Sequence, residues 1–229
     1  MAGEDYLAWA AQHIRDFLEQ ARNALFIPYA GVMNSDEYFQ KVTDALASTV
    51  NLSSIHKHTD PVEAIKQCDA ILVGGGNTFK LVDQLYRHNV IDVIRERVNS
   101  SLPYVGWSAG SNVACPSLKT TNDMPIMEPP SFNTLNLVPF QINPHFTDQT
   151  IPNFGGETRS ARIMEFIEVN PDIYVLGLRE GNYIEVHGNE YRYVGHDDLE
   201  VFHSSFKHKT LKAGCSLNFL KDGSVSGLQ

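Results

Sequence analysis

The residues best suited to chemistry surround a serine, in the pentapeptide Gly106-Trp107-Ser108-Ala109-Gly110. The pentapeptide matches Gly-x-Ser-x-Gly, follows the short apolar run 102–105 and precedes residues 111–114, which could begin a helix. A strand, a sharp turn and a helix form the context in which this motif presents a nucleophilic hydroxyl at the end of a sheet. The alternative is a glycine-rich turn that contains an ordinary serine.

A serine nucleophile needs a general base, a group that orients the base, and donors for the oxyanion. Of the nine histidines, His145 is favoured as the base, because Pro144 stiffens the chain before it and a long loop ends there. Glu180 follows a buried strand and is the candidate orienting group, although a glutamate there could also be a surface turn residue. The order Ser108, His145, Glu180 argues against an α/β-hydrolase, in which the acid precedes the histidine.

Backbone N–H groups close to the serine could stabilise the oxyanion. Ala109 directly follows the serine, and Gly75 or Gly76 could provide a second donor, because a missing side chain lets the backbone approach the substrate. The same glycine run, residues 74–77, could instead cradle a phosphate. However, no Gly-Lys-Ser/Thr follows it and no Gly-x-Gly-x-x-Gly is complete, so nucleotide binding is the weaker interpretation.

The elements that must position these residues alternate between helices and strands. Apolar spacing and capping residues predict helices over residues 6–22, 34–50, from 60 onward, 79–87, 91–98 and 159–169. Short buried runs predict strands over residues 25–28, 70–73, 102–105 and 173–176, a hairpin over 183–194 and short strands over 209–212 and 215–220. Residues 116–144 form the longest stretch that we expect to be irregular.

This alternation predicts one α/β domain over residues 1–229, with a mainly parallel sheet and helices on both faces. In such sheets, ligands bind beyond the carboxyl ends of the strands. Residues 74–77, 106–108 and 179–182 each follow a predicted strand, so we expect these loops to share one edge. The shared edge favours the catalytic interpretation of Ser108.

Composition limits the partners. The formal net charge of −9 argues against nucleic acid and anionic membranes, which both favour lysine and arginine. The widely spaced Cys68, Cys115 and Cys215 predict no disulfide framework and no zinc site. The acidic residues 1–5 predict no signal peptide, and no apolar run approaches the ~20 residues that cross a bilayer, so a cytoplasmic protein is expected.

No cofactor is expected either. His56 and His58 could bind a metal as a pair, but the sequence suggests no third ligand for them.

Several segments, taken together and in order, resemble the peptidase E family, the α-aspartyl dipeptidases, which are serine peptidases related to cyanophycinase. The segments are residues 26–31, 71–79, 106–110, 120–125, 141–146 and 180–182. The resemblance extends from about residue 25 to residue 181, nearly the whole chain. Family members usually begin with an apolar strand before the first helix, whereas this sequence starts almost at that helix.

The resemblance implies a flavodoxin-like fold similar to class I glutamine amidotransferases, with serine where those have cysteine. It implies Ser108 as the nucleophile, His145 as the general base and Glu180 as the third member, without a metal. The substrates would be dipeptides with an N-terminal aspartate. Gly156-Glu157-Thr158-Arg159 matches a family segment whose arginine holds the aspartyl carboxylate, a role that a guanidinium fulfils with two parallel hydrogen bonds. The alternative for Arg159 is a solvated residue in the first turn of a helix.

Two other functions remain open at this point. One is a hydrolase of the same fold that acts on a related aspartyl or acyl substrate. The other is a catalytically silent binding protein, which would not need Ser108, His145 and Glu180 together. The expected partner is a small peptide, and a homodimer is compatible with the sequence.

Overall fold

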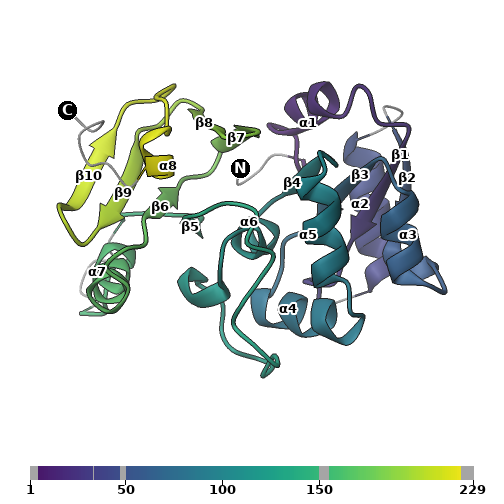
Figure 1. Cartoon of the computed structure of the whole chain (residues 1–229), viewed down its shortest axis with the longest axis horizontal. Helices are drawn as coiled ribbons and strands as arrows, with labels where there is room; N and C mark the ends of the chain where they lie inside the picture. Colours follow the sequence, from purple (N-terminus) through teal and green to yellow (C-terminus); the bar gives the residue numbers. More distant parts are fainter. Residues whose placement is uncertain (1–4, 33, 47–49, 150–154, 223–229) are drawn as a thin grey trace. The chain divides into compact units, whose positions relative to one another are not determined.

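The computed structural model describes residues 5–32, 34–46, 50–149 and 155–222 (Figure 1). The chain divides into two compact units. The N-terminal unit comprises residues 1–119 and 123–137, and the C-terminal unit comprises residues 120–122 and 138–229. Each unit is described by itself below, and the single domain expected over residues 1–229 stays a prediction.

The N-terminal unit contains a four-stranded sheet in the order β2-β1-β3-β4. Its strands are β1 (Asn23–Ile27), β2 (Asn51–Ser54), β3 (Ala70–Val73) and β4 (Tyr104–Gly106). All neighbouring pairs are parallel, so the carboxyl ends of the four strands lie at the same edge. This order is typical of flavodoxin-like sheets. The prediction of a mainly parallel sheet is therefore confirmed.

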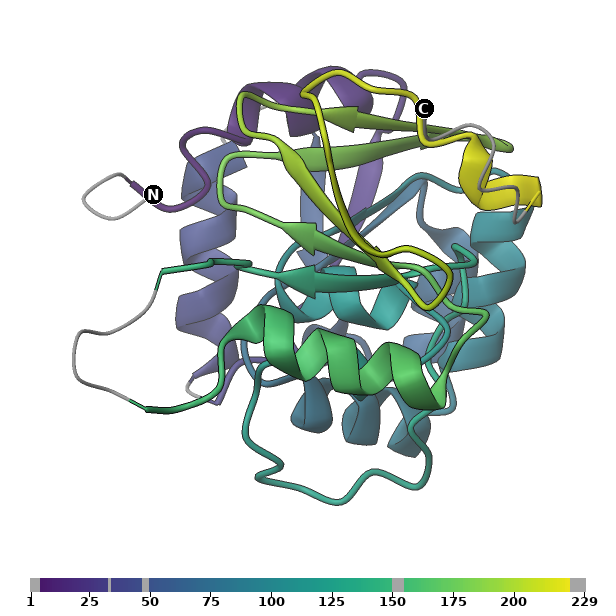
Figure 2. The same ribbon diagram turned by 90° about the vertical axis from the view of Figure 1, so that its left-hand side faces the viewer.

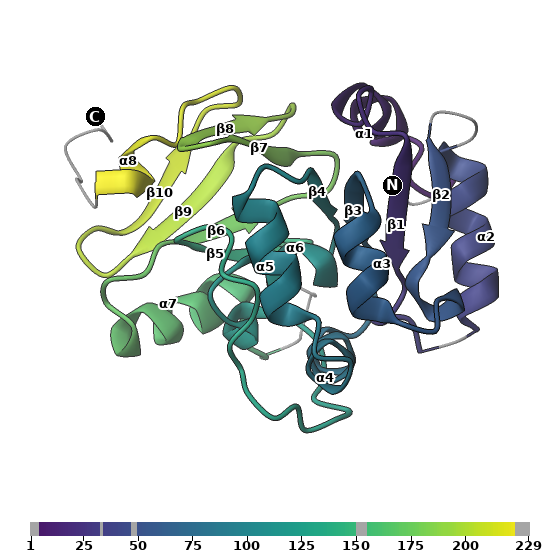
Figure 3. The same cartoon turned by 45° about the vertical axis from the view of Figure 1, so that its right-hand side comes forward.

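Helices cover both faces of this sheet (Figure 3). On one face, Phe26 and Leu72 pack against α1 (Ala11–Phe17) and α2 (Ser35–Leu46). On the other face, Leu25, Ile27 and Ile71 pack against a second set of helices. This set comprises α3 (Pro61–Gln67), α4 (Thr78–Arg87), α5 (Ile91–Asn99) and α6 (Ala109–Ala114). Successive strand residues point to opposite faces, and both sets are apolar because both faces are buried.

The C-terminal unit contains a second four-stranded sheet, in the order β10-β9-β6-β5. Its strands are β5 (Gln141–Pro144), β6 (Val175–Leu178), β9 (Leu199–His203) and β10 (Lys207–Leu211). Strands β5 and β6 are parallel, and the other pairs are antiparallel. Helix α7 (Arg159–Val169) lies beside this sheet (Figure 2). Its Ile163 and Ile167 pack against Val175 and Phe202 of the sheet. Strands β7 (Tyr183–His187) and β8 (Glu190–Val194) form the predicted hairpin, and α8 (Phe219–Asp222) follows β10.

Most predicted elements are present, with different ends. Helix α1 is shorter than the predicted helix over residues 6–22, and α2 ends at Leu46, whereas residues 47–49 lie outside the described ranges. The 3₁₀ helices η1 (Ile55–Lys57) and η2 (Leu118–Thr120) complete the fold. None of the helices in the described ranges is long and apolar enough to cross a membrane.

The sequence does not predict β2, β5 or β9, and the prediction of irregular chain up to residue 144 is wrong at β5. In β2, Leu52 is the only apolar residue, and pairing with β1 determines the strand. In β5, Asn143 and Pro144 favour a loop by composition. The strand predicted over residues 215–220 is also wrong, because only Ser216 forms an isolated bridge and the chain then enters α8.

Candidate active site

The backbone at Ser108 is strained. The residue follows β4 directly, precedes α6, and has φ 55° and ψ −114°, a combination that residues other than glycine rarely adopt. Such backbone costs about 1–3 kcal/mol and persists only where its surroundings determine it. The chain therefore forms the strand, sharp turn and helix that the Gly-x-Ser-x-Gly motif predicts.

The two glycines of the motif are required because the turn is so tight. A Cβ atom on Gly106 would lie 2.5 Å from the carbonyl oxygen of Gly110, and one on Gly110 would lie 2.2 Å from that of Val73. The Tyr104 hydroxyl donates to the Gly110 carbonyl at 2.7 Å, which braces the turn from the side of β4. The spacing of the motif thus has a steric origin in this protein.

The loop after β3 lies against the candidate nucleophile. Because β3 and β4 are parallel, with Val73 opposite Gly106, their following loops are neighbours. A Cβ atom on Gly75 would lie 2.8 Å from the Ser108 Cβ and 3.3 Å from its Oγ. Within the described residues, the backbone N–H groups of Gly75, Gly76 and Ala109 have no hydrogen-bond partner. Unsatisfied donors at this point are suited to an oxyanion.

Asp123 fixes the other end of the glycine loop. Its carboxylate accepts hydrogen bonds from the backbone N–H of Thr78 at 2.7 Å and from the Thr78 hydroxyl at 2.6 Å. Next to it, the Asn77 side chain caps α4 by accepting from Lys80 N–H at 3.1 Å and donates to the Met124 carbonyl at 2.8 Å. Asp123 belongs to the family-like segment 120–125, and its two hydrogen bonds with Thr78 explain why it lies beside the glycine loop.

In the C-terminal unit, His145 and Glu180 come from adjacent strand ends. Strands β5 and β6 are parallel, with Pro144 opposite Leu178, so both residues lie just beyond the same edge. The His145 Nδ1 and the Glu180 Oε1 are joined by a hydrogen bond. Both side chains are about half exposed, at 47% and 53%, so an incoming group can reach the imidazole.

The backbone at His145 is also strained, with φ 54°. Two donors hold the Pro144 carbonyl immediately before it: Asn122 Nδ2 at 2.8 Å and Arg159 Nη1 at 3.3 Å. The buried Asn143 side chain donates to the Asn122 Oδ1 at 2.9 Å. These polar contacts fix the end of β5, and the sequence alone does not reveal them.

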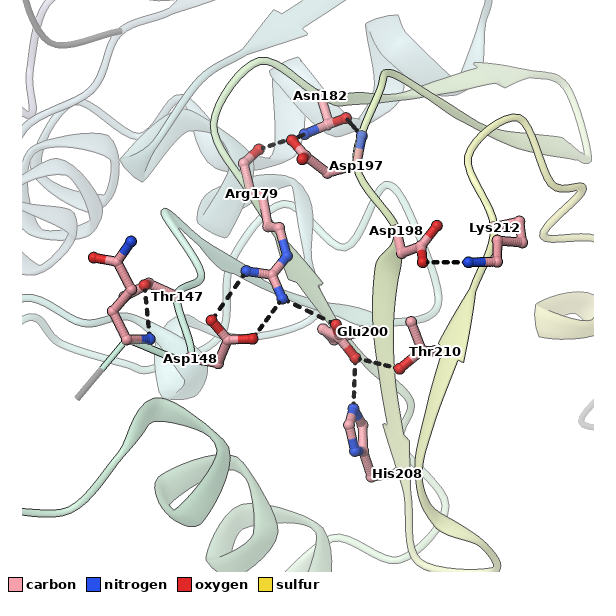
Figure 4. Close-up of polar contacts among 11 residues, drawn as sticks. Thr147, Asp148, Arg179, Asn182, Asp197, Asp198, Glu200, His208, Thr210 and Lys212 are labelled. Atoms are coloured by element: carbon pink, nitrogen blue, oxygen red, sulfur yellow. Dashed lines mark hydrogen bonds and ion pairs between the residues drawn. The ribbon is translucent and has the colours of Figure 1, made fainter.

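Asn182 stabilises the turn that carries Glu180, a role that the sequence does not predict. Its side chain is buried, donates to the Glu180 carbonyl at 2.8 Å and to the Asp197 carboxylate at 3.0 Å. Its Oδ1 accepts from the N–H of Asp197 at 3.1 Å (Figure 4). It also accepts from the N–H of His196 at 2.9 Å. The only sequence signal for this role is its place in the segment Glu180-Gly181-Asn182.

Two arginines of the C-terminal unit, Arg159 and Arg179, differ in their partners. Arg179 pairs with Asp148 at 3.1 Å and with Glu200 at 3.0 Å (Figure 4). Arg159, at the start of α7, forms no ion pair within the described ranges. Burial, with a smaller contribution from Arg162, lowers the pKa of Arg159 from its usual value. Arg159 is therefore a partly desolvated cation that could receive a carboxylate ligand.

The histidines that could form a metal pair have other partners. His56 contacts the Ser54 hydroxyl through Nδ1 at 2.7 Å and Asp36 through Nε2 at 3.2 Å. His58 contacts the Ser53 hydroxyl at 3.3 Å. In the part of the chain that the structure describes, no three His, Cys, Asp or Glu side chains gather as metal ligands.

The structure thus brings the predicted residues together in two sets. Ser108 lies with Gly75, Gly76 and Ala109 in the N-terminal unit, and His145 lies with Glu180 and Arg159 in the C-terminal unit. The family model of peptidase family S51 matches residues 1–194. The chain belongs to peptidase family S51. It is therefore a serine-type peptidase, and the expectation of an enzyme is confirmed.

Relatives of this S51 peptidase agree with the resemblance found in its sequence. A peptidase E from Shewanella amazonensis is 46% identical over 217 residues, which cover 94% of this chain and 92% of the relative. A peptidase E from Nostoc sp. is 45% identical over 203 residues, 87% of this chain and 84% of the relative. A solved peptidase from an acI-B1 Actinobacterium shares the fold, with a TM-score of 0.64 at 17% identity over 94% of this chain and 93% of that one.

The contact between Gly75 and Ser108 generates a prediction. Gly75→Ala should lower kcat/KM by about 100-fold, because the added methyl group displaces the serine and misplacements near 1 Å can cost that much. Gly155→Ala is the matched control, since a Cβ atom there would meet no atom of the described residues within 4 Å. Steady-state kinetics and thermal unfolding of both variants test this. Unchanged kinetics of folded Gly75→Ala would contradict the close approach.

Proposed function

We propose that this S51 peptidase hydrolyses dipeptides with an N-terminal aspartate, using Ser108 as the nucleophile, His145 as the general base and Glu180 as the orienting acid. The observation that carries the proposal is the strained turn at Ser108, beside backbone N–H groups that have no hydrogen-bond partner among the described residues. The hydrogen-bonded pair of His145 and Glu180 supports it. So does the similarity to proteins named peptidase E.

The proposed reaction is acyl transfer to the serine, followed by hydrolysis. Ser108 Oγ attacks the peptide carbonyl carbon while His145 Nε2 accepts the hydroxyl proton, which it then gives to the departing amine. Glu180 accepts a hydrogen bond from Nδ1–H and stabilises the imidazolium that forms. The N–H groups of Ala109 and of Gly75 or Gly76 stabilise the negative charge on the carbonyl oxygen. Water then attacks the acyl carbon while His145 accepts its proton; the bond to Ser108 Oγ breaks, the aspartate is released as the free acid, and His145 returns the proton to Oγ.

Arg159 is the proposed selector of the aspartyl side chain. The chain has a formal net charge of −9, so an acidic substrate needs a local cation. Arg159 is partly buried and forms no ion pair among the described residues, whereas Arg179 already has two carboxylate partners. A guanidinium can bind a carboxylate with two parallel hydrogen bonds.

Removal of the nucleophile is the first test of this proposal. Ser108→Ala should lose activity on Asp-Leu by about six orders of magnitude, as in subtilisin, because only the attacking hydroxyl is removed. Ser100→Ala changes an exposed serine in the same unit and should behave as wild type. A tenth of the wild-type rate in purified Ser108→Ala would rule out the serine mechanism.

Removal of the base should be nearly as damaging. His145→Ala combined with Ser108→Ala should be little slower than either single variant, because the two residues act as one unit. In the wild type, kcat/KM should fall as the pH falls, because a protonated imidazole cannot accept the serine proton. Rate profiles against pH and the double-mutant cycle measure both effects. Multiplicative losses in the double variant would contradict the pairing.

Substitution of Arg159 tests the specificity. Arg159→Lys keeps the charge but loses the two-pronged contact, and Arg159→Ala leaves a substrate carboxylate without a partner, at a cost of about 2–5 kcal/mol. We therefore expect kcat/KM on Asp-Leu to decrease in the order wild type, Lys, Ala, while a small fluorophosphonate still labels all three.

Arg162→Ala is the control for the Arg159 series, because Arg162 lies on the same helix, is largely exposed and pairs only weakly, with Glu157 at 3.6 Å. It should leave kcat/KM on Asp-Leu nearly unchanged. If Arg159→Ala still strongly prefers aspartate over asparagine at the first position, another residue recognises the acid.

A further inference from the structure

A chain of hydrogen bonds in the N-terminal unit ends on the glycine loop beside Ser108. The indole Nε1 of Trp107 lies 2.7 Å from the Tyr6 hydroxyl oxygen, which lies 2.9 Å from that of Tyr38. The Tyr38 hydroxyl in turn lies 3.0 Å from the carbonyl oxygen of Gly75. This series of hydrogen bonds thus connects Trp107, the residue before the candidate nucleophile, with the glycine loop that faces Ser108.

The protons available on each group determine which group donates in each of these hydrogen bonds. An indole N–H can only donate, a carbonyl can only accept, and each tyrosine hydroxyl has a single proton. Trp107 therefore donates to Tyr6, Tyr6 donates to Tyr38, and Tyr38 donates to Gly75. Burial raises the pKa of Tyr38 and that of Tyr6 above their usual values, so both hydroxyls keep their protons well beyond neutral pH.

Packing holds the Tyr38 ring in this position. The ring meets Phe26 edge-on at 5.1 Å between centroids, and Phe26 stacks on Trp107 at 5.9 Å. A Cβ atom on Gly74 would lie 2.4 Å from the Tyr38 hydroxyl oxygen, so the hydroxyl fits only because residue 74 has no side chain. The Tyr38 hydroxyl therefore packs directly against Gly74 and donates a hydrogen bond to the carbonyl of Gly75.

We propose that Tyr38 is a positioning residue for the peptidase reaction: by holding the Gly75 carbonyl, it directs the N–H of Gly76 toward the oxyanion. The peptide between the two glycines is trans, so its N–H points away from its carbonyl oxygen. The Gly76 N–H has no hydrogen-bond partner within the described residues. This inference rests on the proposed function, since it concerns the oxyanion of that reaction.

Tyr38→Phe tests the inference, because it removes the hydroxyl and keeps the ring. Loss of an oxyanion donor costs about 10²–10³ in kcat. In Tyr38→Phe the Gly76 N–H is still present but its peptide is less firmly oriented, so we expect kcat on Asp-Leu to fall about 10-fold with KM nearly unchanged. The rate constant for phosphonylation by a fluorophosphonate should fall by a similar factor, because charge also develops on its phosphoryl oxygen. Thermal unfolding reports whether the variant is folded.

Tyr86→Phe is the matched control, since Tyr86 lies in the same unit and its hydroxyl also donates to a backbone carbonyl, that of Asn133, at 3.2 Å. It should leave kcat and the phosphonylation rate unchanged. If Tyr38→Phe proves unstable, Tyr6→Phe replaces it; this change removes the donor to Tyr38 and should lower kcat by a smaller factor.

Two results would overturn the inference. One is a folded Tyr38→Phe variant whose kcat and phosphonylation rate match those of Tyr86→Phe. The other is a rise in KM without a fall in kcat, which would assign Tyr38 to substrate binding. Failure of the proposed function looks different: wild-type enzyme would be inactive on Asp-Leu, or Ser108→Ala would remain active.

Discussion

The candidate site depends on one steric constraint, the close approach of the loops that follow β3 and β4. Parallel pairing of these strands places Gly75 against Ser108, and the turn around the serine leaves no room for a Cβ atom at Gly106 or Gly110. The strained serine backbone costs about 1–3 kcal/mol. Burial of α6 residues such as Ala109 and Val113 in the core offsets that cost, so the turn persists.

In the C-terminal unit, two polar side chains, His145 and Glu180, are held at a partly exposed edge of the sheet. Adjacent parallel strand ends bring His145 and Glu180 into contact, and buried amide side chains fix the backbone around them. Asn182 satisfies four polar groups around the Glu180 turn, and Asn122 holds the carbonyl that precedes His145. The buried amide side chains therefore fix the backbone that carries the base and the acid, whereas the glycines permit the tight turn that carries the nucleophile.

The features of the site that the sequence could predict are local ones. The elbow at Ser108 is visible because its steric requirements act within five neighbouring residues, and the β7–β8 hairpin is visible because Gly188 marks its turn. The features that were missed depend on distant partners. The composition of β5 favours a loop, and the hydrogen bond that its Asn143 side chain makes with Asn122 is not apparent from the sequence. The contact of Tyr38 with Gly75 likewise joins residues that are 37 positions apart. Such contacts have no sequence pattern that could reveal them.

The most direct test of the account is a crystal structure of the enzyme after reaction with a fluorophosphonate. The account predicts phosphorus bonded to Ser108 Oγ, with a phosphoryl oxygen within hydrogen-bond distance of the N–H groups of Ala109 and Gly76. It also predicts His145 Nε2 beside the adduct, with Nδ1 still paired to Glu180. An adduct on another residue, or an adduct on Ser108 with His145 remote from it, would contradict the proposed triad.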